Sequence, residues 1–124
     1  MRQKIFAMSI VAASFFTSAA PAHHSYASFD QARTVNVAGV IKEFQWKNPH
    51  VVVVLSVTDP RSKKVTDWTL EGPSPNGLRR AGWNGAMIKA GDRATLKINP
   101  MRNGAPGGSL VGVTVGSRTY LKED

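Results

Sequence analysis

Apolar and polar residues alternate with a period of two over most of the chain after residue 33, a pattern typical of half-buried β-strands. The first such stretch runs from Val35 to Trp46, and Gly39 shifts its apolar phase, which predicts a bulge or sharp bend at this glycine. A second stretch, 50–58, is apolar on both faces near its start, which favours a central or covered strand. Further strands are predicted over 64–71, 93–99 and 109–115, followed by a short segment at 118–121.

The pattern changes between the third and fourth predicted strands. Ser74 is a good N-cap, Pro75 suits the first helical position, and Gly82 can end a helix, so we expect a short helix or a single turn here. Three strands, a short helix and two strands is the order of the five-stranded Greek-key barrel of the oligonucleotide/oligosaccharide-binding (OB) fold. The sequence therefore predicts an all-β, OB-like barrel with one short helix. A small open sandwich and another type of barrel are the alternatives.

The first 22 residues have the features of an export signal. Arg2 and Lys4 give a positive start, 5–16 is an apolar stretch, and Ala20-Pro21-Ala22 is a small-x-small cleavage pattern. The apolar stretch is short for a membrane span, which makes a retained anchor the weaker alternative. Cleavage after Ala22 leaves 102 residues in the periplasm or outside the cell. We divide the chain into a signal peptide (1–22), an extended lead-in (23–33) and one barrel domain (34–124).

Composition narrows the chemistry available to the mature chain. It has no cysteine, which excludes disulfides, thiolate metal sites and thiol nucleophiles. Without Arg2 and Lys4, fourteen basic residues face eight acidic ones, a net charge of +6. This charge favours anionic partners such as lipid headgroups or acidic glycans, whereas export argues against nucleic acid. The basic residues are scattered, which is also typical of an ordinary soluble surface.

Three histidines are candidate metal ligands: His23, His24 and His50. If cleavage follows Ala22, His23 carries a free α-amine and an imidazole that together chelate one ion. His50 supplies a third nitrogen, and His24 is either a fourth ligand or a bystander. Copper(II) accepts square-planar nitrogen sets, so copper is the leading candidate and zinc the second. The alternative is that the doublet is a polar terminus that binds nothing and His50 only orders its loop.

Aromatic and basic residues provide a second candidate surface for stacking on sugars and for contacting anionic groups. Its members are Trp46, Lys47, Arg79, Arg80 and Trp83. Aromatic residues of a small domain are usually buried, and we expect Phe44 and Trp68 to belong to the core. The surface predicts a metal-free interaction module that recognises a glycan, lipid or protein of the cell envelope.

No residue pattern supports catalysis. No spacing links the carboxylates or serines to a histidine in a hydrolase-like triad. Glu71, at a strand end before Gly72-Pro73, is the carboxylate best placed for a site at the barrel rim, as an oxygen ligand. The simpler interpretation, which we favour, is an exposed strand-end carboxylate. Met87 and Met101 offer soft thioether sulfur for copper(I), and packing or loop positions explain them as well.

Several motifs follow one another in a fixed order along the mature chain. They are His23-His24-Ser25, the segments 44–50 (FQWKNPH), 68–71 (WTLE) and 78–83 (LRRAGW), and Gly91-Asp92. On these motifs, nearly the whole mature chain resembles a family of small exported bacterial proteins of unknown function. The resemblance implies a single exported all-β domain and carries no activity, cofactor or partner with it.

Overall fold

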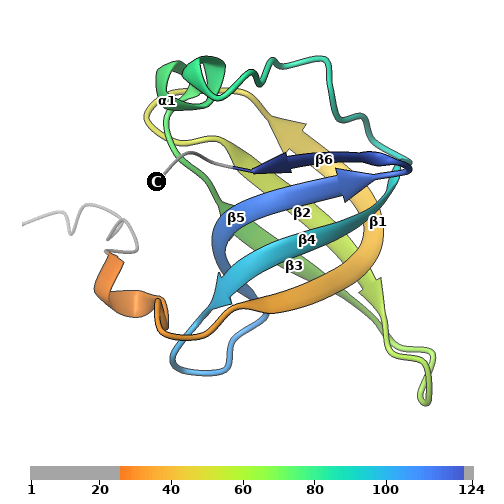
Figure 1. Cartoon of the computed structure of the whole chain (residues 1–124). Coiled ribbons are helices and arrows are strands. Elements are labelled where there is room, and N and C mark those ends of the chain that lie inside the picture. The colour runs from red at the N-terminus through yellow and green to blue at the C-terminus, as the bar shows by residue number, and fades with distance from the viewer. Residues whose placement is uncertain (1–25, 122–124) are drawn as a thin grey trace, which may run out of the picture.

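The computed structural model describes residues 26–121, so the predicted signal peptide, His23 and His24 lie outside the described residues. Six strands, one α-helix and one 3-10 turn follow the predicted order (Figure 1). The elements are η1 (Tyr26–Ser28), β1 (Val35–Gln45), β2 (Val52–Thr58), β3 (Val65–Glu71), α1 (Pro75–Arg80), β4 (Arg93–Pro100), β5 (Gly107–Val115) and β6 (Arg118–Leu121). No helix within this part of the chain is long and apolar enough to cross a membrane.

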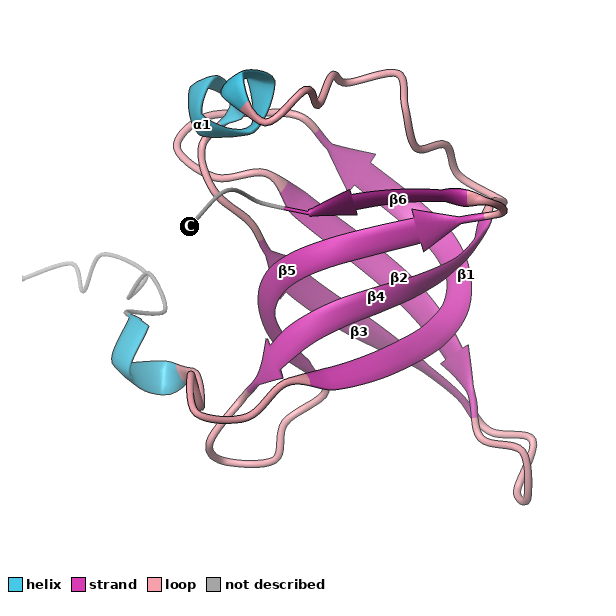
Figure 2. Cartoon of the chain, viewed as in Figure 1, coloured by secondary structure: helices cyan, strands magenta, loops and turns pink. Residues whose placement is uncertain are grey.

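The strands close into a barrel. Their order in the sheet is β3-β2-β1-β4-β5-β6, and a parallel pairing of β3 with β5 joins the two ends of the five-stranded set (Figure 2). Thr69–Glu71 of β3 pair with 107–109 of β5, while 112–115 of β5 pair with β6. The predicted all-β, OB-like barrel with one short helix between β3 and β4 is confirmed. β6 adds a sixth strand on the outside of the closed set.

β1 serves two parts of the barrel because it changes partner along its length. Val35–Val40 pair with β4, and Val40–Gln45 pair with β2. The β-bulge lies between Ile41 and Glu43, so the bulge expected at Gly39 is displaced. At Gly39 itself, a Cβ would lie 2.4 Å from the Ser56 carbonyl oxygen. This glycine therefore permits close approach of the two backbones.

Inward side chains of alternating strand residues form the core, as the period of two predicts. Its members are Val37, Ile41, Val51, Val53, Leu55, Leu70, Leu78, Trp83, Ile88, Ala94, Leu96, Ile98, Leu110 and Val113. Phe44 and Trp68 are half-buried and pack against this core, in line with their expected place. The core residues come from β1 to β5, from α1 and from the segment that follows it, so the core joins the barrel to the helix that lies over its end.

α1 lies over one end of the barrel and has the predicted cap (Figure 1). The Gly77 amide donates to Ser74 Oγ over 3.2 Å, and Pro75 occupies the first helical turn. Gly82 ends the segment with φ = +86°, a backbone conformation that favours glycine. Leu78 then points into the core and fixes the helix to the barrel.

A surface ion pair between β1 and β3 predicts a specific acid sensitivity. Lys42 Nζ and Ser56 Oγ both donate to the Asp67 carboxylate, and these hydrogen bonds hold its pKa below the ordinary value. Because the pKa of Asp67 is lower in the folded state, its ionised form stabilises the fold at any pH above the unfolded-state pKa of about 4. This stabilisation is lost as the pH falls through the folded-state pKa. Asp67→Asn should therefore flatten the fall of the melting temperature below about pH 4. Glu43→Gln is the matched control, and equal acid profiles for Asp67→Asn and wild type would refute this assignment.

Candidate functional site

At one rim of the barrel, His50 of the β1–β2 loop and Glu71 at the end of β3 lie side by side. We call these two residues the rim pair. His50 Nε2 lies 3.5 Å from Glu71 Oε1, and their side chains are 38% and 23% exposed. The register of β2 against β3, with Val52 opposite Glu71, places the two residues side by side. Backbone bonds hold both ends of the pair: the Val51 amide donates to the Pro73 carbonyl, and the Gly72 amide donates to the Val51 carbonyl. Backbone hydrogen bonds thus bring together two residues that are far apart in the sequence.

The separation of the two atoms suits ligands of one ion. Donor atoms about 2.0–2.1 Å from a metal lie ~3.4 Å apart at a tetrahedral angle and ~2.9 Å apart at a right angle. The observed 3.5 Å between His50 Nε2 and Glu71 Oε1 is close to the first value, and a small side-chain rotation gives the second. Within residues 26–121, no group of three or more His, Asp or Glu side chains is placed to hold a metal. The rim pair therefore supplies two donors and needs others from outside this range.

Glu71 also faces a groove that the N-terminal lead-in helps to form. The groove has a volume of about 290 Å³, and Phe29, Met101 and Pro106 line it together with Glu71. Most of its lining is apolar or glycine, from the end of β3, the β4–β5 loop and the lead-in. The rim pair therefore adjoins a concave surface rather than a flat one.

The lead-in is anchored beside this groove. Phe29 is 5% exposed and forms an isolated β-bridge with Met101. The Asp30 amide donates to the Pro100 carbonyl, and the Arg102 amide and Nε donate to the carbonyls of Ser28 and Ala27. Phe29 is thus the buried aromatic residue of the lead-in, whereas Tyr26 is exposed. η1 consequently lies against the β4–β5 loop (Figure 1).

The candidate ligands His23 and His24 lie outside the described residues, so their distance from His50 stays untested. Chain length limits it nonetheless. The anchored Phe29 follows His23 by six positions, which corresponds to roughly 20 Å of fully extended chain at ~3.3 Å per residue. Phe29 and Glu71 line the same groove. The length of the chain is therefore compatible with His23 as a ligand beside the rim pair, which stays a prediction.

The predicted aromatic and basic surface is only partly assembled. The Arg79 guanidinium lies 5.7 Å from the ring centre of Trp46, a cation–π distance, and Phe44 contacts Trp46 edge-on at 5.9 Å. Lys47 and Arg80 are exposed. The prediction that Trp83 belongs to this surface is wrong. Its side chain is 3% exposed and packs beside Tyr120 in the core, so it is not available for stacking on a ligand.

The family of the chain can now be stated. Residues 11–110 match a family of unknown function, DUF6152. The chain belongs to this family. No curated protein and no solved structure matches it.

The DUF6152 match covers all the candidate ligands, because His23, His24, His50 and Glu71 fall within residues 11–110. It confirms the resemblance to an uncharacterised family. The exported and bacterial character of that family stays a prediction.

Sequence reasoning singled out both His50 and Glu71 but did not pair them. The signal was available in the strand pattern, because the hairpin register of β2 and β3 sets Val52 opposite Glu71. The groove was missed entirely. It depends on the parallel closure of β3 with β5 and on the bridge between Phe29 and Met101, and no local pattern encodes either contact.

Proposed function

We propose that this protein is an exported binding protein that holds a copper ion between its mature N-terminus and the barrel rim. His23 contributes its α-amine and imidazole, His50 contributes Nε2, and Glu71 contributes a carboxylate oxygen. His24 is a bystander or an additional nitrogen donor. The single observation that carries the proposal is the rim pair, whose atoms lie 3.5 Å apart on the edge of the groove that the lead-in adjoins.

The chemistry of this donor set favours copper. Three nitrogens and one oxygen make the tetragonal N,O environment that copper(II) prefers, and copper(II) stands at the top of the divalent affinity order. Zinc(II) accepts the same ligands in a tetrahedron and is the second choice. Met101 lines the groove next to Glu71, where a thioether is available to copper(I).

A periplasmic or secreted location belongs to the same proposal. It rests on the signal peptide predicted for residues 1–22, because only cleavage after Ala22 frees the amine of His23. The rim pair is only half-buried, which is compatible with loading from solution after export. No catalytic step is proposed for the ion.

A metal-free interaction module is the second candidate, and the Trp46–Arg79 contact favours it. The Arg79 guanidinium over the Trp46 ring, together with the exposed Lys47 and Arg80, gathers positive charge around one aromatic side chain. The partner would be an anionic glycan, lipid or protein of the cell envelope. This surface involves neither His50 nor Glu71, so the two functions can be tested separately.

The rim pair makes the copper proposal testable by substitution. His50→Ala and Glu71→Gln in the mature protein should each weaken copper(II) binding at least about tenfold, because the loss of a ligand exceeds the loss of an outer-shell contact. Lys47→Ala and His24→Ala are the controls and should retain more of the affinity. The measurement is a competition titration with a copper chelator of known affinity. Wild-type affinity in both rim variants would refute the proposal.

A further inference from the structure

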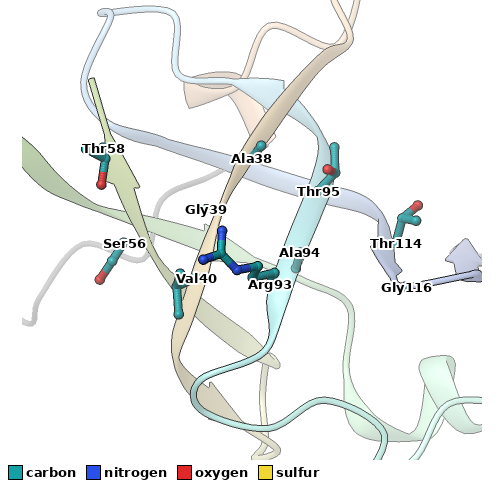
Figure 3. Close-up of a pocket in the computed structure, with 10 residues that line it drawn as sticks. All are labelled: Ala38, Gly39, Val40, Ser56, Thr58, Arg93, Ala94, Thr95, Thr114 and Gly116. Atoms are coloured by element: carbon teal, nitrogen blue, oxygen red, sulfur yellow. The ribbon is translucent and has the colours of Figure 1, made fainter. Parts of the chain in front are cut away.

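The outer face of the barrel has a second concave surface, at the bend of β1. It is a hollow of about 420 Å³ formed by β1, β2, β4 and the end of β5 (Figure 3). The rim pair and the hollow lie toward opposite ends of β2: His50 precedes that strand, whereas Ser56 and Thr58 close it. The hollow is therefore separate from the proposed copper site.

The register of the strands explains the composition of the hollow. Val40 is opposite Ser56 on one side and Arg93 on the other, and directly opposed residues point to the same face. Val40 is exposed, so this row of three faces outward. A second outward row starts at Ala38, which pairs with Thr95.

The second row continues onto β5, where Thr95 pairs with Thr114. Ala38 and Val40 give the hollow a small apolar centre, next to the glycine backbone at Gly39. Hydroxyl groups of serine and threonine and one guanidinium surround this centre. An apolar floor within a ring of hydroxyls suits a sugar ring, whose C–H face is apolar and whose edge is polar.

Arg93 gives the hollow its charge. Figure 3 shows its side chain extending from β4 toward Gly39 and Val40 of β1. Within the described part of the chain, the Arg93 side chain makes no hydrogen bond or ion pair, and the lining contains no carboxylate. Asp67, which accepts from Ser56 Oγ, is already paired with Lys42. The guanidinium is thus free to bind a planar anion in a bidentate manner.

We propose that this hollow binds a sugar carboxylate, a hexuronic acid, either free or as a unit of an acidic glycan. Arg93 pairs with the carboxylate, the ring lies over Ala38 and Val40, and the surrounding hydroxyls contact the sugar hydroxyls. The volume of about 420 Å³ lies within the usual range of small-molecule sites and accommodates one sugar ring. Ser56 Oγ, which donates to Asp67, still accepts a bond from a sugar hydroxyl.

An NMR titration of the mature protein tests this site. D-galacturonate at millimolar concentration should shift the backbone amides of Ala38, Val40 and Thr95, while the matched neutral sugar D-galactose should shift them far less. Arg93→Gln should weaken galacturonate binding at least tenfold, and Arg33→Gln, which removes the same charge from an exposed position outside the hollow, should not. Oligogalacturonate binding more tightly than the monomer would identify a glycan, and equal binding would identify the free acid.

A substitution that fills the hollow provides a second, independent test of galacturonate binding. Ala38→Val adds volume at an exposed strand position and should abolish the galacturonate shifts without lowering the melting temperature. Gly39 is unsuitable for this purpose, because a Cβ there meets the Ser56 carbonyl oxygen. The proposal is overturned if galacturonate causes no shifts, if galactose or inorganic phosphate binds as tightly as galacturonate, or if Arg93→Gln binds like wild type.

Discussion

Acetylating the α-amine of His23 in the mature protein is expected to weaken copper(II) binding at least about 100-fold. Removing a residue that only hydrogen-bonds to a metal ligand already weakens metal binding by up to about 100-fold, and acetylation removes a ligand itself. Acetylation removes the terminal charge and one donor of the proposed chelate while leaving every side chain in place. The barrel should keep its melting temperature in the absence of metal, because its core does not involve residue 23. The measurement is a chelator competition on the acetylated and free forms.

A cycle with the rim variant sharpens this result. If the amine and His50 bind one ion, acetylation should matter much less in the His50→Ala protein than in wild type, because the chelate is already incomplete. Independent, additive losses would indicate two separate copper sites. Unchanged affinity on acetylation of the wild-type chain would exclude the N-terminal amine as a ligand.

Replacing Gly39 by alanine is expected to destabilise the fold by about 3 kcal/mol or more, the level of severe overpacking. The new Cβ would lie 2.4 Å from the Ser56 carbonyl oxygen and 3.0 Å from Leu55 Cγ, and the first of these atoms belongs to backbone that cannot rotate away. Relief requires β1 and β2 to separate at the bend where β1 changes partner. Chemical denaturation of the apo protein measures the change in the free energy of unfolding.

The neighbouring residue supplies the control for Gly39→Ala. Ala38 is on the same strand and its side chain is exposed, so Ala38→Val should change the free energy of unfolding by less than about 0.5 kcal/mol. Equal stability of Gly39→Ala and wild type would contradict the close approach of β1 and β2. A large loss in Ala38→Val would show instead that any added volume on this strand is poorly tolerated.

Local patterns predicted the elements and their order correctly. The cap at Ser74-Pro75 and the stop at Gly82 depend on residues within one helical segment, and the alternation of Val51, Val53 and Leu55 reflects which face of one strand is buried. Strand order followed from the sequence of elements, because three strands, a helix and two strands restrict the topology severely.

Features that depend on contacts between residues far apart in the sequence could not be predicted from local patterns. Gly39 disturbs the apolar alternation, yet only the position of Ser56 on the next strand shows that it permits close approach while the bulge lies beyond Ile41. Trp83 follows a helix that ends in a basic pair, and its burial depends on the barrel core and on Tyr120 of the last strand. The groove beside Glu71 likewise exists only after the barrel closes.

Pulsed EPR of the copper(II)-loaded mature protein is the decisive measurement for the shared copper site, because it detects the remote nitrogens of bound imidazoles. We expect the imidazoles of His23 and His50 in the wild-type spectrum, and the loss of one imidazole in His50→Ala and in His23→Ala. A loss in His24→Ala would identify His24 as an additional nitrogen donor, and no loss would identify it as a bystander. Glu71→Gln should retain both imidazoles and change the coordinated oxygen. A spectrum without imidazole modulation, or one that His50→Ala leaves unchanged, would contradict a copper site shared between the N-terminus and the barrel rim.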